Sequence, residues 1–390
     1  MSCYISSNEN RFYAGLETHY GTVANVAAAS RLSAVSLTAK QSPDRAVRRD
    51  KTGSRTYIGD AGVPRKKTDW ELKTYMTGWN GGSTPPPYGP LFQGALGAAP
   101  WISNGGTIDS VLNGNHLHFT AVHGLAVGQA VRFGGEIRFV SAIADPQSIV
   151  VNAPFTLPPA SGGAMGSTMT YHPAMDNPSV SIFDYWGPNT AVQRVISGAA
   201  VNKLKISVNA DYHEFSFSGG AKDLIDNTSF SAGQGQLTDF PPEPLLADFN
   251  YSIIPGHLGQ VWLGTSPNQF FTLTKAEIEL DNGMDLRVRE FGTNGAQCIV
   301  AGQRSVSMNF SLYEQDDAAT KELYQAARQR SPISVMFQLG QQSGQLAGVY
   351  MQNVVPELPE FDDSEVRLQW KFTGCRAQGT VDDEFYVAFA

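Results

Sequence analysis

Apolar and polar residues alternate in several stretches of the chain, and this period of two predicts β-strands. The clearest stretches are 66–76 and 274–280. Successive side chains of a strand point to opposite faces, so one face of each stretch is apolar and the other is charged. The charged positions are Asp69, Glu71 and Lys73 in the first stretch, and Glu277, Glu279 and Asp281 in and just after the second. Both stretches are therefore predicted to be strands with one buried face.

Two other stretches predict helices. Residues 316–330 begin with acidic side chains, continue through an alanine-rich middle and end with arginines. This order complements the helix dipole, whose amino end favours negative charge. Residues 88–98 predict a second, shorter helix. Each predicted helix follows a charged, alternating strand, so the same local order occurs in both halves of the chain.

Four segments recur in the same order in the two halves. They are Asp44–Arg48 and Asp285–Arg289, 66–75 and 304–313, Leu91–Ala95 and Leu323–Ala327, and Phe215–Gly219 and Trp370–Gly374. Their offsets are 241, 238, 232 and 155 positions. The drop of 77 falls across short strands punctuated by Gly and Pro, which predict a small all-β module. A duplicated domain with an insertion in its first copy explains this spacing, and two unrelated β domains are the alternative.

The predicted fold class is mainly β, with two tandem β-sandwich or barrel-forming domains that each carry a flanking short helix. The first domain comprises 1–102 and 173–230, with a small all-β module inserted at 103–172. Residues 231–258, rich in Ser, Gly and Pro, form the predicted linker, and 259–390 form the second domain. Residues 1–30 are predicted to be an irregular arm.

Composition narrows the classes of function. The net charge of −8 and the pI near 5.4 argue against nonspecific DNA binding, which depends on neutralising phosphates. The three cysteines are far apart and odd in number, so neither a disulfide framework nor a zinc site is expected. No signal peptide and no apolar run of membrane-spanning length are present, so the chain is expected to be soluble and made in a reducing cytoplasm.

Candidate chemistry is sparse. His116 and His118 share one face of a predicted strand, but no third ligand follows at a suitable spacing. The run Tyr212–Glu214 and the pair Asp362 and Asp363 are possible acid–base groups, but solvated strand-end and turn positions explain them better. No phosphate loop or nucleophile elbow is present. The chain is therefore expected to be no enzyme, with no catalytic residues, no metal site and no cofactor.

A basic cluster lies in a predicted hairpin loop after residue 43. It comprises Arg45, Arg48, Arg49, Lys51 and Arg55. One interpretation is a solvated loop. The favoured one is a long arm that reaches a neighbouring subunit and pairs with acidic residues there, because contacts between subunits concentrate in long loops. The candidate partners are Asp362, Asp363, Asp382 and Asp383.

The segment Glu17-Thr18-His19-Tyr20-Gly21-Thr22 resembles the E-T-x-Y-G-T start of major tail tube proteins of long-tailed (siphovirus-type) bacteriophages. The stretch Ala200–Ser207, leading into Phe215–Gly219, is also similar to that family. The resemblance implies domains of two packed β-sheets with a flanking helix that associate edge to edge into a barrel around a channel. Six domains surround such a channel, so three chains with two domains each suffice, and six chains are the alternative.

The resemblance also implies a function, namely a structural virion protein whose stacked rings form a DNA channel. Its partners are itself and the tail terminator, tape measure and distal tail proteins. DNA passes without specific binding, no membrane is involved, and assembly takes place in the host bacterial cytoplasm. The charged strand faces are candidates to line the lumen, with an ordinary solvent face as the alternative, and the inserted module is expected outside. Alternative functions are a baseplate or distal tail ring, an injection-system tube, or a cell-surface carbohydrate-binding β protein.

Overall fold

The computed structural model describes residues 4–45, 50–51, 53–57, 59, 64–79, 81–187, 190–208, 211–245, 252–287 and 290–390. Strands dominate these residues, as predicted. Two α-helices occur among them, α1 (Gly89–Leu96) and α2 (Ala318–Gln329), and both lie within the predicted stretches. No helix in the described ranges is long and apolar enough to cross a membrane.

The first half of the fold consists of α1 and the strands before and after the inserted module. Its elements are η1 (Ser7–Glu9), β1 (Arg11–Leu16), η2 (Ala28–Ser30), β2 (Arg31–Leu32), β3 (Ala34–Asp44), β4 (Arg65–Tyr75), β13 (Val180–Tyr185), β14 (Arg194–Ala199), β15 (Lys203–Val208), β16 (Glu214–Ala221), β17 (Asp223–Asp226) and η3 (Gln234–Gln236).

The second half contains α2 and the strands from residue 259 onward. They are β18 (Gly259–Gly264), β19 (Asn268–Gln269), β20 (Leu273–Asp281), β21 (Asp285–Leu286), β22 (Ile299–Val300), β23 (Ser305–Tyr313), β24 (Ile333–Leu339), β25 (Ala347–Val355), β26 (Glu360–Asp362), β27 (Gln369–Gln378) and β28 (Tyr386–Phe389).

The two halves share one topology. In the first half β1 pairs with β13, β13 with β14, and β14 with β17; in the second, β18 pairs with β24, β24 with β25, and β25 with β28. The other sheet runs β3-β4-β16-β15 in the first half and β20-β23-β27-β26 in the second. Corresponding strands occur in the same order along the chain, and β4 pairs with β16 as β23 pairs with β27.

The registers match at the level of single residues. Phe217 lies opposite Leu72 in the first half, and Phe372 lies opposite Phe310 in the second. These four residues belong to segments that the sequence comparison paired independently. Strand order, pairing and register are therefore alike in the two halves.

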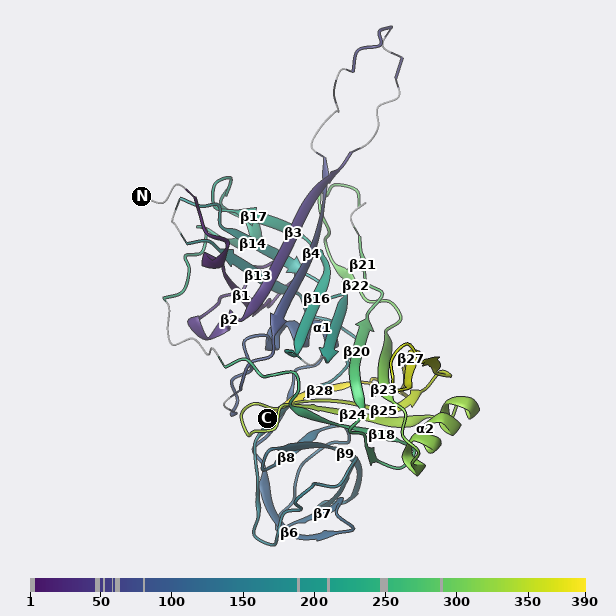
Figure 1. The fold of residues 1–390 in the computed structure, drawn as a ribbon. Helices are drawn as coiled ribbons and strands as arrows, with labels where there is room; N and C mark the ends of the chain where they lie inside the picture. The colour runs from purple at the N-terminus through teal and green to yellow at the C-terminus, as the bar shows by residue number, and fades with distance from the viewer. Residues whose placement is uncertain are drawn as a thin grey trace.

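A single junction joins the halves into one sheet. Strand β15 of the first half pairs antiparallel with β20 of the second over six residues. The resulting sheet runs β3-β4-β16-β15-β20-β23-β27 and continues from β27 through β25, β24 and β18 to β19, while β26 pairs with another part of β27. Figure 1 shows β3, β4, β16, β20 and β23 following one another across the molecule. One apolar core runs under both halves, and Phe92 of α1 lies at the centre of its aromatic cluster. Its ring centroid is 5.1–5.7 Å from those of Tyr171, Phe215, Phe217 and Phe389.

An inserted module, residues 106–165, lies between α1 and β13. Its six-stranded sheet has the order β11-β6-β7-β10-β9-β8 and its own apolar core. The strands are β6 (Gly106–Leu112), β7 (His116–Phe119), β8 (Ala130–Phe133), β9 (Glu136–Asp145), β10 (Ser148–Val151) and β11 (Ala164–Met165). Two connecting strands, β5 (Trp101–Ser103) and β12 (Thr168–Tyr171), pair with each other, and β12 also pairs with β28.

The inserted module packs on the second half, although the chain enters and leaves it from the first. Phe139 of β9 stacks on Tyr350 of β25 at 5.1 Å, and Ile137 belongs to the same apolar cluster. The module therefore covers the outer face of the sheet β18-β24-β25-β28, at the lower end of the molecule in Figure 1.

The prediction of an irregular arm over residues 1–30 was wrong. Residues 11–16 form β1, a central strand paired with β13 and β2, and Tyr13 and Ala14 are fully buried. The alternation is hidden because four consecutive residues of β1 are buried. Part of the predicted linker also packs on the first half, where Glu243 accepts a hydrogen bond from the Tyr13 hydroxyl at 3.0 Å.

Candidate functional site

The charged strand positions lie together on one polar face of the continuous sheet. In β4, Asp69, Glu71 and Lys73 are exposed between buried Trp70, Leu72 and Thr74. In β20, Glu277, Glu279 and Asp281 alternate with buried Ala276, Ile278 and Leu280. One cross-strand row runs through Glu71, Ser218, Lys203 and Asp281. The structure thus brings two sets more than 200 positions apart in the sequence onto one surface.

These carboxylates are paired with lysines, and the sequence analysis missed three of them, namely Lys67, Lys203 and Lys205. Lys203 Nζ lies 2.9 Å from Glu279 and 3.0 Å from Asp281, and Lys205 Nζ lies 2.7 Å from Glu277. The hydrogen bonds that Lys203 donates to Glu279 and Asp281 raise the pKa of Lys203. In the first half, Asp69 pairs with Lys67 and Glu71 with Lys73. The alternation of polar and apolar residues in 203–207 was the signal that could have found Lys203 and Lys205. The face is charged but internally neutralised, rather than acidic.

Two strands of this sheet, β3 and β26, lack an outer neighbour within the described chain, although β27 also pairs with β25 at Arg376–Gln378. At one end, β3 pairs only with β4, along the whole of Ala34–Asp44. At the other end, β26 pairs only with β27, over three residues. An unpaired edge offers a row of backbone donors and acceptors to another strand. Two such edges on one sheet allow head-to-tail addition of further copies.

The described residues of the basic cluster follow the carboxyl end of β3, on the side of the molecule remote from the inserted module (Figure 1). Arg45, Lys51 and Arg55 are exposed, and Arg48 and Arg49 lie outside the described residues. Two of the candidate acidic partners already have partners within this chain. Asp362 pairs with Lys371, and Asp382 lies 2.5 Å from Arg304. Asp383 accepts a hydrogen bond from the backbone of Thr380 at 2.6 Å.

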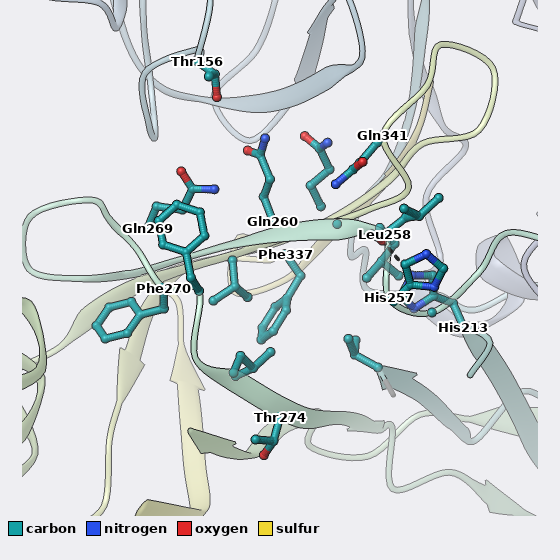
Figure 2. A pocket seen from close by; sticks show the side chains of 18 residues that line it. Thr156, His213, His257, Leu258, Gln260, Gln269, Phe270, Thr274, Phe337 and Gln341 are labelled. Atoms are coloured by element: carbon teal, nitrogen blue, oxygen red, sulfur yellow. Dashed lines mark hydrogen bonds between the residues drawn. The ribbon is translucent and has the colours of Figure 1, made fainter. Parts of the chain in front are cut away.

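An open cavity of about 620 Å³ lies beside β18 and β20, as Figure 2 shows. Gln260, Phe270 and Phe337 line its wall, and His213 lies at one end with its Nε2 3.1 Å from the Leu258 carbonyl. Burial lowers the pKa of His213. Side chains with a nucleophile–base arrangement do not meet among these lining residues.

The remaining candidates form no site of their own. His118 lies 3.3 Å from Asp109 on the exposed side of the inserted module. No group of three metal-ligating side chains occurs within the part of the chain that the structure describes. The prominent features of this molecule are therefore a polar sheet face, two sheet edges and a basic hairpin.

Comparison with known proteins identifies the family. The sequence matches the phage tail tube protein family over residues 7–374. The solid-state NMR and cryo-EM structure of the SPP1 tail tube is a similar solved structure, with 15% identity, a TM-score of 0.26, and coverage of 33% of this chain and 81% of that one. None of the curated proteins matches the sequence. The resemblance noted at Glu17–Thr22 is confirmed by the family match: this chain belongs to the phage tail tube protein family and is a structural component of the virion tail tube.

Proposed function

We propose that three copies of this chain form each ring of the tube, giving six sandwich units around one channel. The β15–β20 junction is the observation that carries the proposal. It joins two units of the same topology edge to edge, so it provides one of the contacts that a six-unit ring needs. Equivalent contacts between chains would close the sheet and remove both exposed edges.

In this arrangement the polar face of the continuous sheet lines the channel. Asp69, Glu71, Lys73, Glu277, Glu279 and Asp281 are the proposed lumen residues. Their ion pairs with neighbouring lysines support a lumen with little net charge along these strands. DNA carries one negative charge per about 1.7 Å of duplex, so such a wall neither traps it nor strongly repels it. The chain acts as a passive conduit for DNA rather than as an enzyme.

The domain division follows the repeated topology. The first tube domain comprises 1–102 and 173–230, and it is extended by the segment to 245 that packs on it. The inserted module of 103–172 lies outside the channel, because it covers the sheet on the opposite side of the second half. The second domain is 259–390. At the ends of the tube, the tail terminator, tape measure and distal tail proteins are the proposed partners, and assembly takes place in the host cytoplasm.

Light scattering and electron microscopy of the purified protein test this proposal. Rings with a mass of three 42.1 kDa chains, and hollow filaments made of them, are the expected result. Rings of six chains would overturn the stoichiometry. Monomers that persist at high protein concentration would overturn the assembly function itself.

The basic hairpin is the proposed contact between stacked rings. Reversing the charge of Lys51 and Arg55 to glutamate should leave single rings intact and stop them from stacking. Electrostatic attraction between exposed groups is screened by salt, so wild-type stacking should also weaken as ionic strength rises. Negative-stain microscopy measures filament length for both proteins. Filaments of unchanged length from the double variant would contradict this role.

A further inference from the structure

We propose that Lys40 of one chain lies opposite Glu360 of the next chain in the ring, at a junction that repeats β15–β20 with its charges exchanged. This inference rests on the ring proposed above and adds the strands, the register and the residues of its contact. The internal junction serves as the template, because both units that meet there have the topology of the units that would meet between chains.

The first step is the equivalence of β3 and β20. Strand β3 puts Leu37 opposite Leu72, and β20 puts Ala276 opposite Phe310. Leu72 and Phe310 are equivalent, because each lies opposite the matched phenylalanine of its own half. Counting along the two strands from there makes Lys40 the equivalent of Glu279. Both side chains point to the polar face.

The second step is the equivalence of β26 and β15. Strand β15 puts Lys205 opposite Ser216 and Ile206 opposite Phe215. Strand β26 puts Glu360 opposite Lys371 and Phe361 opposite Trp370. Phe215 and Trp370 open the matched segments of the two halves, so Glu360 is the equivalent of Lys205, and Phe361 of Ile206.

Combining the two steps gives the register between chains. Inside the chain, Lys205 lies opposite Glu279, and Ile206 opposite Ile278. Between chains, the same register puts Glu360 opposite Lys40, and Phe361 opposite Ala39. The cation and the anion exchange strands, and the contact remains complementary.

The exposure of Lys40, Glu360 and Phe361 in the single chain is consistent with a contact that forms only between chains. Ile206 is fully buried under β20, whereas its equivalent Phe361 is 57% exposed. Lys40 and Glu360 are both exposed, and neither forms an ion pair with any residue in the described ranges. By contrast, their equivalents Glu279 and Lys205 are each bound to an opposite charge.

The exchange of charges also distinguishes correct from incorrect pairing. If β3 of one chain added to a β15 edge, Lys40 would face Lys205. If β26 added to a β20 edge, Glu360 would face Glu279. Like charges directly opposite each other destabilise a strand pair, so the exchanged polarity disfavours both errors during assembly.

Charge reversal tests the pair. Lys40→Glu and Glu360→Lys should each raise the protein concentration needed for half-assembly of rings about tenfold, since the altered contact occurs at every junction between chains. The double variant should return close to the wild-type concentration. Lys275→Glu, an exposed reversal on β20 away from both edges, is the matched control and should change little. Sedimentation velocity over a concentration series provides the measurement.

The possible results distinguish a failure of the Lys40–Glu360 register from a failure of the proposed ring-forming function. If wild-type protein forms no rings, the proposed function fails. If rings form and both single variants assemble like the wild type, or if the double variant is no better than the single ones, the register is wrong and the ring stands.

Crosslinking gives a second, independent readout. Lys40→Cys and Glu360→Cys are combined in a chain whose Cys3 and Cys298 are replaced by serine, and assembled rings are treated with a short bismaleimide. Covalent dimers and trimers should appear on a denaturing gel, with the trimer as the largest species. Neither single-cysteine chain should form trimers. Assembled rings that yield no covalent product would overturn the register, and a covalent hexamer would overturn the three-chain ring.

Discussion

Replacing Glu17 with alanine is expected to lower the free energy of unfolding by about 3–5 kcal/mol, because four buried donors lose their acceptor. The carboxylate is 6% exposed and accepts hydrogen bonds from the Ser179 and Ser181 hydroxyls at 2.6 and 2.7 Å. It also accepts from the backbone N–H groups of Gly21 and Gly198 at 2.7 and 2.8 Å. Glu17 thereby joins the strands β1, β13 and β14 to the turn that follows β1.

Chemical denaturation of the wild-type protein and of the Glu17→Ala variant measures this loss of unfolding free energy. Glu17→Gln keeps the shape and one acceptor oxygen, so its loss should be intermediate. Glu314→Ala changes an exposed carboxylate and should stay within about 0.5 kcal/mol of wild type. A loss below about 1 kcal/mol for Glu17→Ala would show that water replaces the missing acceptor.

The same contacts explain the motif that carried the family resemblance. Gly21 has a φ of +76°, and a Cβ there would lie 2.3 Å from the Lys222 side chain. The Tyr20 ring lies under Lys222 Nζ at 5.6 Å. The run Glu17–Thr22 is therefore a structural turn that closes one end of a sheet, and its residues need no role in the channel.

Replacing Arg138 with methionine is expected to lower the free energy of unfolding by about 3–5 kcal/mol, because it leaves buried polar partners without a donor. The Arg138 side chain is fully buried between the inserted module and the second half. It donates to the carbonyls of Pro154 and Ile137 at 3.0 and 2.7 Å, and to the side chains of Gln260 and Gln338 at 3.0 and 3.2 Å. Burial lowers its pKa to about 10, so it stays charged at neutral pH beside Glu136.

Denaturation curves again give the measurement, and limited proteolysis of the inserted module reports where the damage occurs. Arg376→Met removes an exposed arginine and serves as the matched control, with an expected change within about 0.5 kcal/mol. Adding Glu136→Gln to Arg138→Met should recover part of the loss, since it removes the uncompensated carboxylate. Equal stability of the Arg138 and Arg376 variants would contradict a structural role for the buried arginine.

Arg138 also illustrates what sequence could not provide. It lies in one of the short strands predicted from Gly and Pro punctuation, but its partners Gln260 and Gln338 are more than 120 positions away. The sequence also gave no sign that the inserted module packs on the second half, because the chain enters and leaves the module from the first half. The pairing of Glu279 with Lys203 and of Glu277 with Lys205 was hidden for the same reason, because it crosses the junction between two distant strands.

The sequence by itself determined the local elements and their repetition. Period-two alternation located β4 and β20, the order of acidic and basic charges located α2, and the ordered echoes between the halves predicted an insertion. These features depend on which side chains share a face of a strand or helix, and the spacing of residues along the sequence determines that. Only the tertiary structure decided which edges meet: β15 pairs with β20 inside the chain, and β3 and β26 are left without an outer neighbour among the described residues. Backbone hydrogen bonds are alike for every residue, so pairing between distant strands is selected by the packing of the whole core and not by any local pattern.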